Sequence, residues 1–260
     1  MRIALGLSYN GSGYEGWQSQ LSGNTIQDRL EHALGQFTAQ QFRVNCAGRT
    51  DAGVHGLMQV VHFDTALDRD EASWVRGTNA FLPRDIAVQW ARHMPDDFHS
   101  RGSAIARRYA YVVLESPVRP SVEAGRVGWV YRPMDGAAME RAAAHLVGEH
   151  DFSSFRAAQC QAKSPIKTLT RITVSQRGPY WRFEFEANAF LHHMIRNIMG
   201  CLLSVGQGAH NPEWILEVLA ARNRDAAAPT FSPDGLYFMG PVYEDRYALP
   251  ASAPAYDWLP

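Results

Sequence analysis

Two periodicities run through the 260-residue chain and predict its strands and helices. In residues 1–9 an apolar side chain stands at every second position, which is typical of a strand with one buried face. Residues 26–37 are apolar at every third or fourth position, which predicts an amphipathic helix. Asn24 can cap that helix, with Gln27 as its capping-box partner. Further strands are predicted near Phe42–Ala47, Met58–Thr65 and Asp85–Ala91, and a second helix at about Glu71–Phe81.

The second half of the chain repeats this order of elements after a linker at Pro95–Gly102. Its strands are predicted at Arg107–Leu114, Thr168–Ser175, Tyr180–Ala187 and Leu236–Val242. Its helices are predicted after the N-cap Asp135 to about Val147, at Leu191–Val205, and from Asn211-Pro212 onward. Each half therefore has the order β-α-β-β-α-β of a ferredoxin-like unit. We expect an α+β protein with an N-terminal half at 1–100 and a C-terminal half at 101–260.

The segment Cys46–His55 is polar, whereas strand-like sequence flanks it. Its two glycines can adopt backbone angles that other residues resist. Between these glycines lie Arg49, Thr50 and Asp51, which supply a cation, a hydroxyl and a carboxylate. The run Gln59–Phe63 that follows suits a half-buried strand. The pattern predicts a tight loop that presents Asp51 at the edge of a sheet. The alternative is a plain turn in which Asp51 bonds its own backbone.

The string Gly48–His55, followed by Gln59–Phe63, resembles the active-site motif of the TruA family of tRNA pseudouridine synthases. The resemblance covers nearly the whole chain. Other matching segments are Tyr14–Gln20, Gly148–Ser153, Asn188–Asn197, Ala228–Thr230 and Gly235–Phe238. The resemblance implies isomerisation of uridine to pseudouridine in the anticodon stem-loop of tRNA, at positions 38–40 by tRNA convention. It also implies a homodimer, and two halves joined in one mainly antiparallel sheet with helices on one side and a central cleft.

The same resemblance implies three catalytic residues. Asp51 matches the essential carboxylate, and because burial alone favours its protonated form, a nearby cation is needed. Arg196 is the candidate, as the only charged residue of the predicted helix Leu191–Val205, although an isolated arginine there would simply mark a surface edge. Tyr109 matches a tyrosine whose ring can stack on the target uracil and whose hydroxyl can receive the C5 proton. Without the resemblance, a core position like that of Tyr111 would be favoured.

Four further residues are expected to bind the RNA substrate. Arg49 can fill the space left by a flipped nucleotide or bind phosphate, or it forms a plain salt bridge to Asp51. Arg101 and Arg107 add cations close by, as does Arg108. A charged, solvated face is an equally good reading of Arg107 and Arg108. Gln18 lies in an aromatic, amide-rich stretch that matches the family.

No cofactor is expected, because rearranging the uracil ring needs a carboxylate, a proton acceptor and access to the base. The sequence has no P-loop, no Gly-x-Gly-x-x-Gly and no metal-ligand cluster. The adjacent His192 and His193 are not expected to hold a metal ion, because neighbours on a helix point about 100° apart. A role in supporting the site fits them better.

The composition is consistent with a cytoplasmic globular protein, but it does not by itself indicate an RNA partner. The net charge is −1, although of the 25 basic residues only Lys163 and Lys167 are lysine. Arginine suits phosphates and bases, and a GC-rich genome explains the bias equally well. We expect two copies to pool local arginine patches. The three cysteines form no disulfide framework, the N-terminus resembles no signal peptide, and no apolar run is long enough to span a bilayer.

Two other functions compete with this interpretation. A catalytically silent RNA-binding protein could use the same scaffold, but it would have no need of Asp51. A hydrolase with an aspartate nucleophile would need a second carboxylate or a base beside Asp51, and the motif offers only His55. The sequence leaves open whether Asp51 attacks C1′, attacks C6 or removes a sugar proton.

Overall fold

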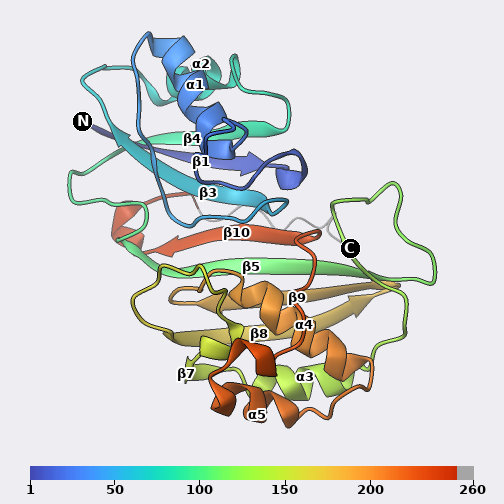
Figure 1. Cartoon of the computed structure of the whole chain (residues 1–260). Coiled ribbons are helices and arrows are strands. Elements are labelled where there is room, and N and C mark those ends of the chain that lie inside the picture. The colour runs from blue at the N-terminus through green and yellow to red at the C-terminus, as the bar shows by residue number, and fades with distance from the viewer. Residues whose placement is uncertain (251–260) are drawn as a thin grey trace. The chain divides into compact units, whose positions relative to one another are not determined.

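The computed structural model describes residues 1–250 and divides them into two compact units. Unit 1 contains residues 1–107 and 237–250, and unit 2 contains residues 108–236. In Figure 1 the colour runs from blue at the N-terminus to red near the C-terminus, so the red strand β10 belongs to the unit that also contains the blue strand β1.

Unit 1 is built on a sheet with the strand order β4-β1-β3-β10, in which β2 also pairs with β3. The strands are β1 (Arg2–Tyr9), β2 (Asn45–Cys46), β3 (His55–Asp64), β4 (Ile86–Met94) and β10 (Leu236–Tyr243). Strand β1 runs antiparallel to both β3 and β4, whereas β10 runs parallel to β3. The predicted β-α-β-β-α-β order of the first half is confirmed.

Two helices, α1 (Ile26–Thr38) and α2 (Glu71–Asn79), pack on one face of this sheet. The N-cap of α1 is Thr25 rather than Asn24, so that prediction is wrong by one residue. The hydroxyl of Thr25 accepts from the Asp28 backbone N–H at 3.2 Å and donates to its carboxylate at 2.6 Å. This reciprocal pair satisfies the first turn of the helix as a capping box does.

The core of unit 1 follows from the alternation in β1. Ile3, Leu5 and Leu7 are fully buried and face the apolar stripe of α1 and the indole of Trp74 in α2. Burying a side chain of this size contributes roughly 1.5–3 kcal/mol. The other face of the sheet carries a smaller cluster, to which Tyr247 contributes from beyond β10. Both faces of β3 are therefore buried, and the motif that precedes it is held on a rigid base.

Unit 2 contains strands with the order β5-β9-β8-β7, and β6 lies beside β5. The strands are β5 (Ala104–Glu115), β6 (Gly128–Val130), β7 (Gly148–Asp151), β8 (Ile166–Arg177) and β9 (Tyr180–Ala187). Strand β8 is antiparallel to both β7 and β9, whereas β6 is parallel to β5. The mainly antiparallel pairing in both units confirms the α+β class.

Helices α3 (Gly136–Ala144) and α4 (Met194–Gly206) cover one face of the unit 2 sheet, and α5 (Trp214–Ala221) follows them in the chain (Figure 1). At Gly136 a Cβ atom would lie 2.8 Å from the Trp181 ring of β9, and at Gly206 it would lie 2.7 Å from the Met139 sulfur. Glycine therefore lets α3 approach the sheet and lets α4 approach α3. The short 3-10 turns of the chain are Gly11–Gly13, Ser153–Phe155, Arg224–Ala226 and Asp245–Tyr247.

Three features depart from the predicted elements. Strands β6 and β7 were not predicted, because three or four residues are too few to show a period. Helix α4 begins at Met194 rather than Leu191, because His193 adopts a left-handed φ of 61°. Strand β10 is present where the closing strand of the second half was predicted, and it also pairs with β3 through Tyr237 and Phe238, a pairing that was not predicted. Pairing across such a sequence separation leaves no local pattern.

None of the helices within residues 1–250 has both the length and the apolar character that crossing a membrane requires.

Candidate functional site

Asp51 lies at the start of a tight turn between β2 and β3. The turn is closed by the Val54 backbone N–H, which donates to the Asp51 carbonyl at 3.1 Å. Gly53 has a φ of 80°, an angle that a side chain would strain. Asp51 itself is half-buried. The predicted loop is therefore present, with its carboxylate at the end of a buried strand.

The segment that follows β1 braces this turn through its backbone. Trp17 N–H donates to the Thr50 carbonyl at 2.9 Å, and Gly53 N–H donates to the Tyr14 carbonyl at 3.4 Å. The hydroxyls of Tyr9 and Thr50 lie 2.9 Å apart in a buried hydrogen bond. Burial raises the pKa of Tyr9, so its hydroxyl stays protonated. Asp51 thus follows a residue that is fixed through both its side chain and its carbonyl.

The other end of the motif is fixed by Gln59, a fully buried residue of β3. Its Nε2 donates to the Gly48 carbonyl at 2.6 Å, and its Oε1 accepts from Gly48 N–H at 3.4 Å. The amide supplies the donor and acceptor that a neighbouring strand would otherwise provide. A Cβ on Gly48 would already lie 3.4 Å from the Phe238 ring, so the loop also packs closely on β10.

His55 is a structural residue of the unit 1 core. It is 2% exposed, and its ring stacks on Tyr237 at 4.7 Å. Its Nδ1 accepts from the Gly11 backbone N–H at 3.1 Å. His55 is therefore buried and its Nδ1 already accepts a hydrogen bond, so it does not suit the role of the base that an aspartate-nucleophile hydrolase would need.

Arg49 is exposed. Among residues 1–250 it makes no hydrogen bond or ion pair, so the plain salt bridge to Asp51 is not formed. A long cationic side chain next to a braced carboxylate turn is free to meet an external anion. This position suits the expected role of Arg49, which is to bind phosphate or to fill the space that a flipped nucleotide leaves.

Arg107 is half-buried rather than solvated, unlike one of its two predicted readings. Its Nη2 donates to the carbonyls of Arg101 at 2.6 Å and Ala47 at 3.4 Å, and its Nη1 donates to Ala104 at 3.0 Å. Arg101 is exposed and places a guanidinium nitrogen 3.8 Å from the sulfur of Cys46, whose pKa burial raises. Arg107 thus ties the chain around Arg101 to the residue that precedes Gly48.

The turn that carries Arg101 is held by a buried histidine. His62 is 3% exposed, and its Nδ1 lies 3.1 Å from the Ser100 N–H that donates to it. Burial and the charge of His99 lower the pKa of His62 to about 4. The neutral ring is therefore the form that accepts this bond. The Tyr243 hydroxyl donates to the Ser100 carbonyl at 2.6 Å and holds the turn from β10.

Tyr109 belongs to unit 2 and lies in β5 with only 9% of its surface exposed. Its ring meets Phe190 edge to face at 5.2 Å. Tyr111 is fully buried on the same strand, and its hydroxyl donates to the Ser232 carbonyl. Tyr109 is the more accessible of the two, and its catalytic role stays a prediction.

Arg196 lies in the first turn of α4 in unit 2 and is half-buried. Its Nε donates to the Phe231 carbonyl at 3.0 Å, and the Phe231 N–H donates back to the Arg196 carbonyl at 3.1 Å. These bonds fix the guanidinium's stem against the segment before β10. The ion pair with Asp51 stays a prediction.

His192 and His193 precede α4 and are not part of it. Because neither residue is helical, the expected separation of about 100° around a helix does not apply to them. Their ring centroids lie 4.1 Å apart, and the ring planes are inclined by 43°. The His192 N–H donates to the Cys160 sulfur at 3.4 Å. All three cysteines are free, as expected.

Gln18 is exposed, whereas its neighbour Trp17 is buried against Tyr9. The residues that sequence reasoning did not assign to the site are its supports, Gln59, Tyr9 and His62. Their only signal is a polar side chain inside an otherwise apolar strand, which must find a partner when buried.

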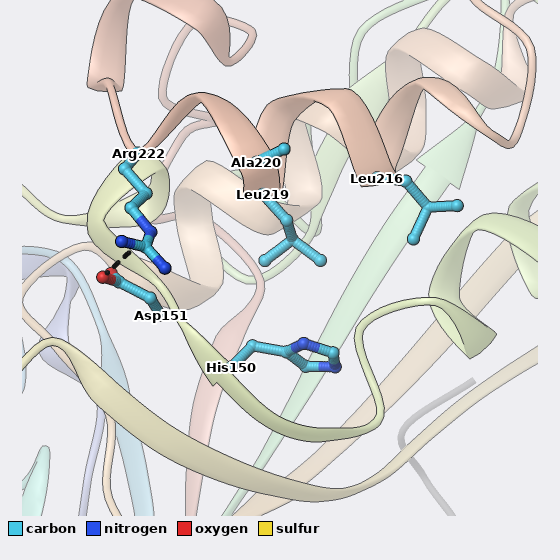
Figure 2. A pocket seen from close by; sticks show the side chains of 6 residues that line it. All are labelled: His150, Asp151, Leu216, Leu219, Ala220 and Arg222. Atoms are coloured by element: carbon cyan, nitrogen blue, oxygen red, sulfur yellow. Dashed lines mark ion pairs between the residues drawn. The ribbon is translucent and has the colours of Figure 1, made fainter.

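A hollow of about 480 Å³ lies in unit 2, and no predicted site residue is among those that line it. Figure 2 shows Arg222 and Asp151 at one end of it and Leu216 at the other, with His150 between β7 and α5. Arg222 pairs with Asp151 at 3.4 Å, and a hydrogen bond from Ser153 lowers the pKa of Asp151. The charges of Arg222 and Asp151 compensate each other.

Comparison with known proteins agrees with this motif. A family model described as tRNA pseudouridine synthase matches residues 7–101 and 142–244. The proteins named tRNA pseudouridine synthase A from Polaromonas sp. (strain JS666 / ATCC BAA-500) and Delftia acidovorans are 78% and 66% identical to the chain, each over the full length of both sequences. A solved structure, a Cbf5-Nop10-Gar1 complex, matches 77% of this chain and 45% of its own chain at 12% identity and a TM-score of 0.35.

The braced carboxylate turn and the α+β units are thus those of a base-modifying enzyme. The chain belongs to the tRNA pseudouridine synthase family. Enzymes of this family are isomerases.

Proposed function

We propose that the protein converts uridine to pseudouridine in the anticodon stem-loop of tRNA, at positions 38–40, with Asp51 as the essential carboxylate. One observation carries the assignment to Asp51. The turn that presents this half-buried side chain is held by Thr50, Gly48 and Gly53 through bonds from three separate segments. A loop that is fixed by several hydrogen bonds suits a catalytic group that must be placed accurately.

The reaction breaks the bond between N1 and C1′ and joins C1′ to C5 of the same ring. The C5 proton leaves and N1 gains one, so no atom is added or lost overall. Asp51 supplies a carboxylate, Arg196 keeps it ionised and Tyr109 stacks on the uracil and receives the C5 proton. The steps need no metal ion and no cofactor.

Contacts to the RNA come from Arg49, Arg101, Arg107 and Gln18. Arg49 and Arg101 are exposed and reach phosphate or the space left by a flipped base. Arg107 has the additional task of holding Arg101 in place through its backbone bond. Because arginine forks bind phosphate oxygens in pairs, lysine is a poor substitute at these sites.

The two halves, 1–100 with the catalytic loop and 101–260, complete one cleft in a cytoplasmic homodimer. Two copies pool their arginine patches, so the net charge of −1 of one copy understates the field that the tRNA meets. Light scattering after gel filtration tests this. A monomer with full activity on tRNA would contradict it.

The central test measures tritium release from tRNA transcripts labelled at C5 of uridine. Wild type, Asp51→Asn and the matched control Asp68→Asn, which alters an exposed aspartate outside the motif, are compared together with their tRNA affinities. Release by wild type and control, none by Asp51→Asn and similar binding by all three are expected. Equal release by Asp51→Asn would overturn the role of Asp51.

The alternative is a silent RNA-binding protein on the same scaffold. It predicts tRNA binding without tritium release from the wild type. The braced Asp51 turn argues against it, because a protein that only binds gains nothing from a fixed carboxylate that repels phosphate.

A further inference from the structure

Unit 2 presents an exposed aromatic and cationic surface that the catalytic proposal does not use. It is formed by residues 116–134, named here the 116–134 platform, which comprise a loop, β6 and the residues that follow. Trp129 of β6 is 38% exposed, and Tyr131, the first residue after this strand, is 58% exposed. Their ring centroids are 6.3 Å apart.

The platform is rigid because buried residues on both sides of Trp129 anchor it. Val127 and Val130 are each 5% exposed and anchor the segment in unit 2. The Trp129 indole N–H donates to the Ser116 carbonyl at 2.8 Å, and the Ser116 N–H donates to the Val130 carbonyl at 3.0 Å. The indole is therefore fixed in its exposed position before any ligand arrives.

The charges of the platform favour an anionic ligand. Residues 116–134 contain the three arginines Arg119, Arg126 and Arg132 but only one carboxylate, in a chain whose net charge is −1. The Arg132 guanidinium lies 5.3 Å from the centre of the Tyr131 ring. The one carboxylate, that of Glu123, accepts a 2.7 Å hydrogen bond from the Tyr180 hydroxyl, which lowers its pKa.

Rigid exposed rings bordered by arginines suit a nucleic acid strand. Bases stack on aromatic faces, while guanidinium groups bind the phosphates between them. A protein partner would use the same residue types. The excess of arginine over carboxylate in the segment favours RNA.

From this geometry we propose that the 116–134 platform is a second RNA-binding surface, which stacks unpaired bases of the tRNA on Trp129 and Tyr131 and holds phosphate with Arg132. This inference rests on the proposed function, because that function makes tRNA the ligand. The platform adds affinity and takes no part in the chemical step.

The test measures the affinity of labelled tRNA transcript by fluorescence anisotropy, with tritium release measured on the same samples. The double variant Trp129→Ala/Tyr131→Ala is expected to bind at least about 10-fold more weakly, because the stacked bases lose both rings. Release at saturating tRNA is unchanged. Leu216→Ala, which removes a side chain of unit 2 that is 45% exposed, is the control and binds like wild type.

A salt titration separates phosphate contact from stacking. Arg132→Gln reduces the slope of log affinity against log salt by about 1, whereas the double aromatic variant leaves the slope unchanged. Arg177→Gln changes another exposed arginine of unit 2 and serves as the matched control. An equal change in slope for Arg177→Gln would mean that the slope depends only on the net charge of the protein. That result would overturn the assignment of a phosphate contact to Arg132.

The outcomes distinguish this inference from the proposed function. Unchanged affinity in the aromatic variant, with tritium release intact, overturns the platform and leaves the function standing. Absence of release from the wild type overturns the function, whatever the affinities are. A shift to a smaller assembly in the aromatic variant, detected by light scattering, would make the platform an interface between copies and overturn its assignment to RNA. Thermal unfolding of each variant verifies that the fold is retained.

Discussion

The side-chain amide of Gln59 makes two hydrogen bonds to the backbone of Gly48, three residues before Asp51. A fully buried residue of β3 thereby fixes the start of the loop whose far end is closed by the bond between Val54 and Asp51. The geometry of the candidate active site depends on a polar group inside the core.

Replacing Gln59 by leucine is expected to lower the free energy of unfolding by about 1–3 kcal/mol, because the half-buried backbone groups of Gly48 lose their partner. Tritium release by the folded variant should also fall, because the turn that carries Asp51 loses its anchor. Urea unfolding and tritium release check the two effects. Gln41→Leu, at an exposed position, is the control, and a similar loss there would show that the effect is not specific to the loop.

Gly16→Ala tests the close approach of the Tyr14–Trp17 segment to the catalytic turn. Gly16 has a φ of 91°, and a Cβ there would lie 2.7 Å from the Thr50 carbonyl oxygen. Gly23 has a φ of 67° but open space around it, so Gly23→Ala reports the backbone strain alone, about 1–2 kcal/mol.

Thermal unfolding should show a larger loss for Gly16→Ala than for Gly23→Ala. Only Gly16→Ala should reduce tritium release. Equal losses in both variants would mean that the contact with Thr50 is unimportant.

Arg49→Lys separates substrate binding from stability. Arg49 is exposed and makes no hydrogen bond or ion pair within residues 1–250. The free energy of unfolding should therefore change by no more than about 0.5 kcal/mol, and the melting temperature by no more than about two degrees. The kcat/KM for tRNA should fall about 10-fold or more, since a lysine cannot present the paired donors of a guanidinium. Arg84→Lys is a matched control at an exposed position. A large drop in melting temperature would instead reveal a structural role.

Stability should depend on the protonation of His62. Its pKa of about 4 in the folded protein is below its ordinary value of 6.5, mainly through burial and then through His99 and Arg2, with Asp64 acting in the opposite direction. Between these values the unfolded chain binds the proton more readily. The free energy of unfolding therefore falls as the pH is lowered from about 6.5 toward 4.

His62→Asn keeps an acceptor near the position of Nδ1 but cannot be protonated, so it should flatten this pH dependence. Urea midpoints measured between pH 7 and pH 4.5 check it. The exposed His32→Asn is the control, and an equal flattening there would assign the effect elsewhere.

The sequence by itself determined the elements and the motif. The period of two in β1 and the period near 3.6 in α1 follow from burial of one face, so local pattern is sufficient to find them. The Gly-bracketed loop around Asp51 was also recognisable, because only glycine accepts the φ of Gly53 at no cost.

Only the tertiary structure decided which residues support that loop. Gln59, His62 and the Tyr9 hydroxyl are polar groups on buried strands, and their partners are 11, 38 and 41 residues away. The pairing of β10 with β3 and the stacking of Tyr237 on His55 join still more distant segments. Period and composition describe which face of an element is buried. They do not specify which distant atoms meet there, because that choice is made by packing and hydrogen-bond satisfaction over the whole fold.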